Sequence, residues 1–168
     1  MRLIPPTSTV VSRLPLPLFS IPAQLAFSHV LLRHPKLFDR LGEHLKKTYA
    51  FILSDLPLCF VIKPEQKTIN VCRKGVPIIA DCEIEGPFSL LLSLAEGRLD
   101  ADALFFSRDI LVTGDMEAMV ALRNTLDDND IDLLHDFTDI CGPFAPLMEK
   151  IALFLRNQIL KKEKTQWN

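Results

Sequence analysis

The chain has 168 residues, a formal net charge of −2 and 48% hydrophobic residues, which is enough for one domain with a substantial core. This charge provides no dense basic surface, so we expect no nucleic-acid partner. Eleven Phe residues accompany a single Trp and a single Tyr, so the aromatic side chains carry few hydrogen-bonding groups. Such a composition suits an apolar interior or a wall that faces lipid.

No apolar run approaches the roughly 20 residues of a membrane-spanning helix. The N-terminus is interrupted by prolines and lacks the pattern of a secretory signal. Four cysteines in a chain of this length do not indicate a disulfide-stapled secreted domain. We therefore expect a cytoplasmic protein, with peripheral contact at the inner membrane as an additional expectation.

Residues 1–21 form an apolar, proline-rich arm that we expect to be extended or irregular. A loose arm and an arm packed on an apolar surface both remain open. Pro22 suits the first turn of a helix, which must end near Pro35. A second helix is expected over roughly 37–53. Its apolar face would consist of Leu37, Leu41 and Leu45.

Three short runs after Pro57 are rich in β-branched and apolar residues, and turn residues separate them. These runs, Leu58–Lys63, 68–74 and 77–85, predict an antiparallel meander with one solvent-facing side. Alternation assigns its apolar face to Phe60, Ile62, Ile69, Val71, Ile78, Ala80, Cys82 and Ile84. Its polar face would carry Asp81, Glu83 and Glu85.

The following elements are a helix over 88–96, a hairpin over 104–113 and a helix capped by Asp115. The first of these helices is apolar on nearly all sides, which is typical of a helix between two apolar layers. A long amphipathic helix is expected near the C-terminus, followed by a basic tail with Trp167. Its apolar face would consist of Phe144, Leu147, Met148, Ile151, Leu155 and Ile159.

No clear catalytic or metal-binding constellation stands out. The cysteines lack a CxxC spacing, and no His is placed beside one to act as a base. The acidic run from Asp128 to Asp139 has EF-hand spacing, but Leu133 stands where the turn requires Gly and Asp139 where Glu normally binds. We therefore expect a protein that is not an enzyme, with no catalytic residues, no cofactor and no metal site. A thiol nucleophile and a calcium loop remain minor alternatives.

Residues 102–117, DALFFSRDILVTGDME, resemble a characteristic segment of the sterol-carrier-protein lipid-binding domain family, in which a hairpin leads into a Gly-Asp helix start. The continuation over 121–128, ALRNTLDD, is similar to accessory factors of bacterial ubiquinone biosynthesis within that family. The resemblance covers roughly residues 45–135. It implies an α+β fold with a roughly five-stranded, mostly antiparallel sheet covered by helices, an apolar tunnel and no catalytic constellation.

The resemblance implies a non-catalytic accessory factor that holds a prenylated quinone precursor, or another lipid, beside the proteins of oxygen-independent ubiquinone biosynthesis. The alternative is a general lipid- or phospholipid-binding adaptor at a membrane surface. We divide the chain into the arm 1–21, a lipid-binding domain 22–142, and a C-terminal helix with basic tail 143–168. Whether that helix contacts a membrane or packs on the core remains open.

Apolar residues exceed the need of one sheet face, although an ordinary tight core would also use them. From the face assignments we expect the ligand wall to consist of Phe60, Ile62, Val71, Ile84, Phe88, Leu91, Leu92, Phe105, Phe106, Met116, Met119 and Val120.

Overall fold

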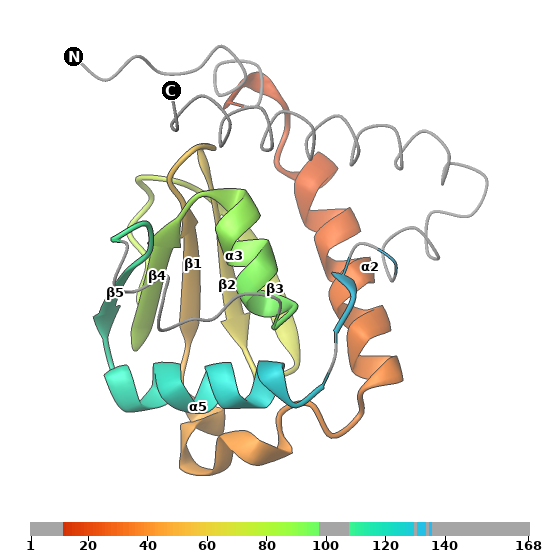
Figure 1. Cartoon of the computed structure of the whole chain (residues 1–168). Helices are drawn as coiled ribbons and strands as arrows, with labels where there is room; N and C mark the ends of the chain where they lie inside the picture. The colour runs from red at the N-terminus through yellow and green to blue at the C-terminus, as the bar shows by residue number, and fades with distance from the viewer. Residues whose placement is uncertain (1–11, 98–107, 130, 134, 136–168) are drawn as a thin grey trace, which may run out of the picture.

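The computed structural model describes residues 12–97, 108–129, 131–133 and 135. Five strands form one sheet in the order β3-β2-β1-β4-β5, with helices α3 and α5 across one face and α2 beside β3 (Figure 1). The pair β1–β4 is parallel, and the other neighbouring pairs are antiparallel. This confirms the expected α+β class with a five-stranded, mostly antiparallel sheet covered by helices.

The elements follow one another along the chain with short connections. The strands are β1 Tyr49–Leu53, β2 Leu58–Lys63, β3 Thr68–Arg73, β4 Cys82–Gly86 and β5 Leu111–Gly114. The helices are α2 Pro17–Arg33, the 3₁₀ helix η1 Asp39–Lys46, α3 Phe88–Ala95 and α5 Met116–Asp127. The expected bounds of β2, and the expected helices over 88–96 and after Asp115, agree with these elements.

Helix α2 begins at Pro17, inside the arm that we expected to be irregular, and Pro22 lies within it instead of at its first turn. The prediction failed because proline is also tolerated early in a helix, and Pro17 occupies that position here. The helix ends at Arg33, before Pro35, as expected.

The segment that follows η1 was predicted as helix through residue 53, and this prediction was wrong. Gly42 has φ of 54° and interrupts the helical path within η1. Residues 49–53 instead form β1, which lies between β2 and β4 in the sheet. Aromatic and β-branched residues favour strands, and a short apolar run does not distinguish helix from strand by its period alone.

The predicted meander of β2, β3 and β4 was also wrong in its third member. The chain after β3 crosses the second face of the sheet, and β4 begins at Cys82 beside β1. Because residues 77–81 are not strand, Ile78 and Ala80 do not share the face of Cys82. They pack against Ala50 and Cys59 on the second face, which is therefore partly apolar and not simply solvent-facing.

The start of α5 is fixed by a glycine and an aspartate. Gly114 has φ of +90°, which side chains rarely allow, and its pairing with Cys82 places it against the backbone of Asp81. The backbone N–H of Asp115 donates to Asp81 O at 2.8 Å. The Asp115 side chain accepts a hydrogen bond from Ala118 N at 3.0 Å, which confirms the predicted N-cap.

Candidate functional site

The register of the strands lines up apolar side chains in rows across the helix-facing side of the sheet, which we call the core face. In sheet order from β3, one row consists of Val71, Phe60, Phe51, Ile84 and Val112. Partners in a register share a face, so these five side chains point toward the helices. Three of them, Phe60, Val71 and Ile84, were predicted wall residues, and the structure places them in this one row.

The next row toward α5 consists of Ile69, Ile62, Tyr49, Cys82 and Gly114. Its centre is the fully buried Tyr49, whose hydroxyl donates to His44 O at 3.1 Å and lies 3.5 Å from Ala118 O. Burial raises the pKa of the Tyr49 hydroxyl well above its usual value, with neighbouring Cys82 as the second cause. The phenol therefore stays neutral and anchors this end of the core.

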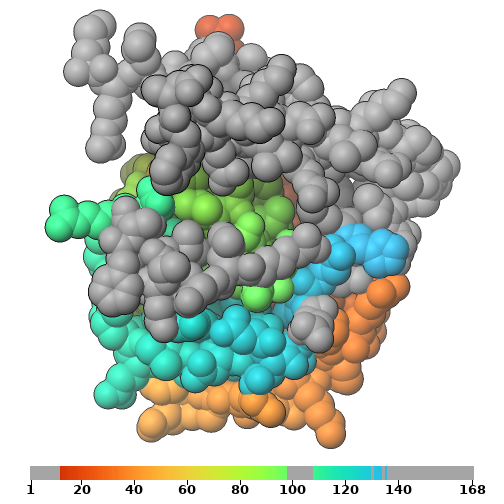
Figure 2. All heavy atoms as spheres, viewed as in Figure 1, coloured from red at the N-terminus to blue at the C-terminus, as the bar shows by residue number. Residues whose placement is uncertain are grey.

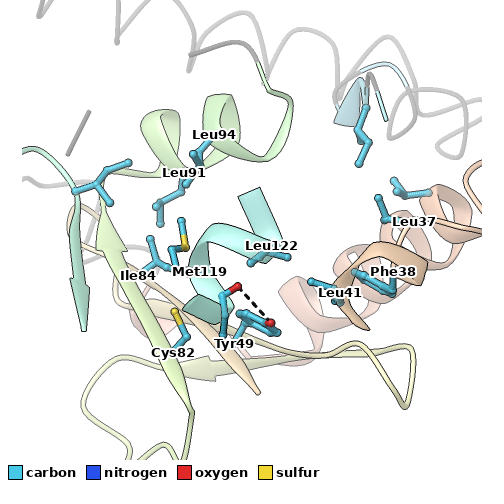
Figure 3. Close-up of a cluster of buried hydrophobic side chains, with 14 of the residues drawn as sticks. Leu37, Phe38, Leu41, Tyr49, Cys82, Ile84, Leu91, Leu94, Met119 and Leu122 are labelled. Atoms are coloured by element: carbon cyan, nitrogen blue, oxygen red, sulfur yellow. Dashed lines mark hydrogen bonds between the residues drawn. The ribbon is translucent and has the colours of Figure 1, made fainter. Parts of the chain in front are cut away.

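Helices α3 and α5 cover the β4 side of the core face. Leu91 and Leu94 of α3 and Met119 and Leu122 of α5 point toward Ile84, Cys82 and Tyr49 (Figure 3). In the space-filling view of the same side, described atoms of α3 and α5 lie at the surface in front of the strands, and those of η1 lie below α5 (Figure 2). Ile84 and Cys82 have no exposed surface, so this part of the core is closed.

The β1–β2 side of the core face, which we call the aromatic region, is less completely covered. Phe51, Phe60 and Ile62 belong to inner strands of the sheet, yet their side chains are only half-buried. Phe88 at the start of α3 and Phe19 of α2 are half-buried beside the same core. Apolar area that stays partly accessible in the middle of a sheet is available to an apolar ligand.

A second aromatic contact, outside the rows of the sheet, joins helix α2 to the residue that precedes η1. The rings of Phe27 and Phe38 lie with their centroids 6.1 Å apart in a tilted arrangement. Phe27 is half-buried, whereas Phe38 is buried in the core. Neither was among the predicted wall residues, although the sequence shows many Phe residues in this half of the chain.

The predicted wall residues fall into four groups. Val71, Ile84, Leu91 and Met119 are buried in the core, and Phe60, Ile62 and Phe88 are half-buried and packed against it. Leu92 of α3 is half-buried as well and, by its exposure, belongs to this second group. Met116 and Val120 of α5 are exposed by 53% and 54% and do not point into the core. Phe105 and Phe106 lie outside the described residues.

Sequence reasoning missed the contribution of β1. Tyr49, Phe51 and Leu53 all point to the core face, because the segment is a strand and its side chains alternate. Their period-2 spacing in the run YAFIL was the available signal. It was overlooked because the segment was assigned to the preceding helix.

Two thiols are held in unreactive surroundings. Burial raises the pKa of Cys59 and of Cys82 to about 11 each, with Cys72 and Asp115 as the respective second causes. Both thiols are therefore protonated at neutral pH and poorly suited to nucleophilic attack. Within the described residues, no group of three or more His, Cys, Asp or Glu side chains is arranged to hold a metal ion.

In the part of the chain that the structure describes, no helix combines the length and apolar character needed to cross a membrane.

The sequence matches the SCP-2 sterol transfer family over residues 27–127, so the chain belongs to this family. Domains of this family are typically non-catalytic lipid carriers, although some occur within enzymes. The matched range includes the C-terminal part of α2, all five strands, α3 and α5. It thus contains both rows of the core face. A search of curated proteins gave no match.

Solved structures resemble this chain at low sequence identity. A structure described as a UbiJ-SCP2 ubiquinone synthesis protein is 21% identical, with a TM-score of 0.56, and the match covers 71% of this chain and 98% of that chain. Sterol carrier protein domain 2 of Helicoverpa armigera is 18% identical, with a TM-score of 0.45, covering 65% and 92%. Apo sterol carrier protein 2 of Yarrowia lipolytica is 16% identical, with a TM-score of 0.44, covering 63% and 90%.

Proposed function

We propose that this protein is a non-catalytic accessory factor that holds a prenylated quinone precursor during oxygen-independent ubiquinone biosynthesis, as its resemblance to bacterial accessory factors of that pathway implies. The single observation that carries the proposal is the half-buried aromatic side of the core face, where Phe51 and Phe60 stay partly accessible within inner strands. Membership of a lipid-carrier family supports it. The likeness to a structure described as a ubiquinone synthesis protein is the reason why we propose the ubiquinone pathway.

The physical role is sequestration of a tail that water rejects. Burying a methylene group stabilises the bound state by about 0.8 kcal/mol, so ten such groups contribute roughly 8 kcal/mol. This corresponds to micromolar affinity before the cost of ordering the tail. The tail would lie against Phe51, Phe60 and Ile62, and the ring would stay accessible to the enzymes of the pathway.

The ligand itself is the first test. Native mass spectrometry and lipid extraction of the purified full chain should recover a prenylated phenol or a related quinone precursor. Recovery of bulk phospholipid alone would favour the general lipid-binding adaptor instead. Recovery of no lipid, together with no uptake of a phenol carrying a C20 prenyl tail, would overturn both forms of the proposal.

A matched pair of substitutions locates the site. Phe60→Leu shortens a half-buried side chain of the aromatic region, whereas Phe38→Leu makes the same change in the closed core. We expect Phe60→Leu to weaken binding of the prenylated phenol several-fold and Phe38→Leu to leave it unchanged. Both should fold, because Leu keeps most of the apolar volume of Phe and the change should cost less than the roughly 3–5 kcal/mol of a Phe→Ala truncation. Equal binding by the two variants would place the ligand elsewhere.

The pathway is tested in cells. A bacterial strain that lacks the gene should make less ubiquinone without oxygen and normal amounts in air. The Phe60→Leu variant should restore anaerobic synthesis less well than Phe38→Leu at equal protein level. An equal defect with and without oxygen would contradict the oxygen-independent role and leave lipid binding untouched.

A second candidate, the membrane-surface adaptor, is favoured by the outer side of α2. Four apolar side chains spaced 3, 4 and 7 residues apart are exposed there: Leu18, Ile21, Leu25 and Leu32, by 53–80%. Residues 12–38 contain three basic residues, Arg13, Arg33 and Lys36, and no Asp or Glu. An apolar stripe beside basic residues suits an anionic membrane surface.

Vesicle flotation tests this contact. The full chain should float with vesicles containing phosphatidylglycerol, and Leu25→Gln with Leu32→Gln should reduce flotation several-fold. Removing residues 143–168 tests the amphipathic C-terminal segment in the same assay. Unchanged flotation after both changes would end the membrane proposal without affecting the precursor-binding role.

A further inference from the structure

One charged side chain lies on the core face beside the aromatic region. Arg73 is the last residue of β3 and pairs with Leu58 of β2. It shares a face with Val71, two residues earlier, because side chains alternate along a strand. Leu58 and Val71 are 3% and 9% exposed, so the stem of Arg73 stands among buried apolar groups.

The guanidinium of Arg73 is only partly satisfied. Nη2 donates to the backbone carbonyl of Leu14 at 2.5 Å. Nη1 is buried and has no hydrogen-bond partner among the described residues. Arg73 also forms no salt bridge with any carboxylate in the described part of the chain. It therefore presents an unfilled cationic donor on an otherwise apolar face.

Such a group calls for an explanation. Buried polar atoms are nearly always hydrogen-bonded, and a buried charged donor without a partner is costly. No carboxylate from the neighbouring helix competes for it: α2 packs against β3, and the whole segment 12–38 contains no Asp or Glu. The fitting partner is an anionic oxygen brought by a ligand.

The position of Arg73 suits the head of an amphiphile. The pair Arg73–Leu58 lies one row beyond Val71–Phe60 and two rows beyond Ile69–Ile62. Rows on one face are two residues apart, so these three pairs span about 14 Å along the strands. A ligand with its head at Arg73 would run its tail past Phe60 to Ile62.

We propose that Arg73 anchors the carboxylate head of the bound amphiphile and thereby selects acidic lipids over neutral ones. This rests on the proposed function, because it requires the tail to occupy the aromatic region. A guanidinium suits this task because it can donate two parallel hydrogen bonds to one carboxylate.

The test compares palmitic acid with its methyl ester, which share a tail and differ in the charged head. Equilibrium dialysis at pH 8 with the full chain should show tighter binding of the acid. Arg73→Met should weaken binding of the acid about 10- to 100-fold, the usual effect of losing a hydrogen bond to a charged group, and leave the ester unchanged. Lys63→Met, which removes the same charge from the second face, should change neither.

Arg73→Lys is the second variant, because it keeps the charge and loses the planar fork. It should retain part of the preference for the acid, and it carries the test if Arg73→Met fails to fold. Equal binding of acid and ester by the wild type, or an equal loss of both in the variants, would overturn the role of Arg73 alone. Failure of the wild type to bind either compound would also overturn the role of Arg73, and the proposed function would fall with it only if the phenol with the C20 prenyl tail is not taken up either.

Discussion

Replacing Gly114 by Ala should strongly destabilise the fold, because this glycine lies at the junction of β5 and α5. A Cβ at this position would lie 2.2 Å from Asp81 O, 3.1 Å from Asp81 C and 3.3 Å from Cys82 Cα. All three are backbone atoms, so no side chain can rotate away to make room. The φ of +90° adds strain for any residue other than glycine.

The expected loss can be estimated from these contacts. A non-glycine residue at positive φ costs about 1–2 kcal/mol through strain. Relieving the overlap requires moving β4 away from Gly114, at a typical overpacking cost of about 1–3 kcal/mol. The same movement breaks the 2.8 Å hydrogen bond from Asp115 N to Asp81 O, worth about 0.5–1.5 kcal/mol. The free energy of unfolding should therefore fall by about 3–6 kcal/mol.

Gly75 provides the matched control. It has φ of +94°, and a Cβ there would meet nothing within 4 Å. Gly75→Ala should therefore show the strain alone, about 1–2 kcal/mol. Urea unfolding followed by circular dichroism measures both variants. If they lose equal stability, the close approach of Gly114 to the Asp81 backbone is not what requires a glycine.

Three further predictions concern the core, the cap of α5 and the thiols. Ile84→Ala should reduce the free energy of unfolding by about 2–5 kcal/mol because Ile84 is fully buried, whereas Ile79→Ala should change it by less than about 0.5 kcal/mol because Ile79 is 95% exposed; similar urea midpoints would contradict this. Asp115→Ala should lower the urea midpoint at pH 7. The helix-cap hydrogen bond, followed by Lys47, lowers the pKa of Asp115, so its contribution is complete above the ordinary carboxyl pKa and is lost as pH falls through the lowered folded value; a constant difference between wild type and variant down to acid pH would refute this. In a Cys141→Ser background, iodoacetamide at pH 8 should label Cys72 before Cys82, because burial raises the pKa of Cys82 to about 11; mass spectrometry of digests gives the order, and preferential labelling of Cys82 would show that it is not buried.

The proposed role of Arg73 gives the lipid site a selectivity that apolar side chains alone would not provide. A wall made only of apolar side chains would hold any hydrocarbon tail of suitable length and would not choose among head groups. A cationic donor at one end of the aromatic region gives the site a direction and a preference. The acid–ester comparison therefore separates the selectivity of the site from its ability to bind lipid.

Features that depend on neighbours in the sequence were predictable from the sequence alone. The bounds of β2, the extent of α3 and the capping of α5 by Asp115 follow from alternation, periodicity and local hydrogen bonding. The resemblance of residues 102–117 to a characteristic family segment also pointed to the right fold. These signals are local, so they do not require knowledge of which strands pair.

Only the tertiary structure decided the placement of β1 and β4. The run 49–53 is too short for its period to separate strand from helix, and its identity follows from burial between β2 and β4. The position of β4 beside β1 depends on the chain crossing the second face, where Ile78 packs against the cluster that contains Cys59. The register likewise places Arg73, which the sequence analysis did not single out, beside Leu58 on the core face. Pairing and burial arise from contacts between residues distant in the chain, which no local pattern encodes.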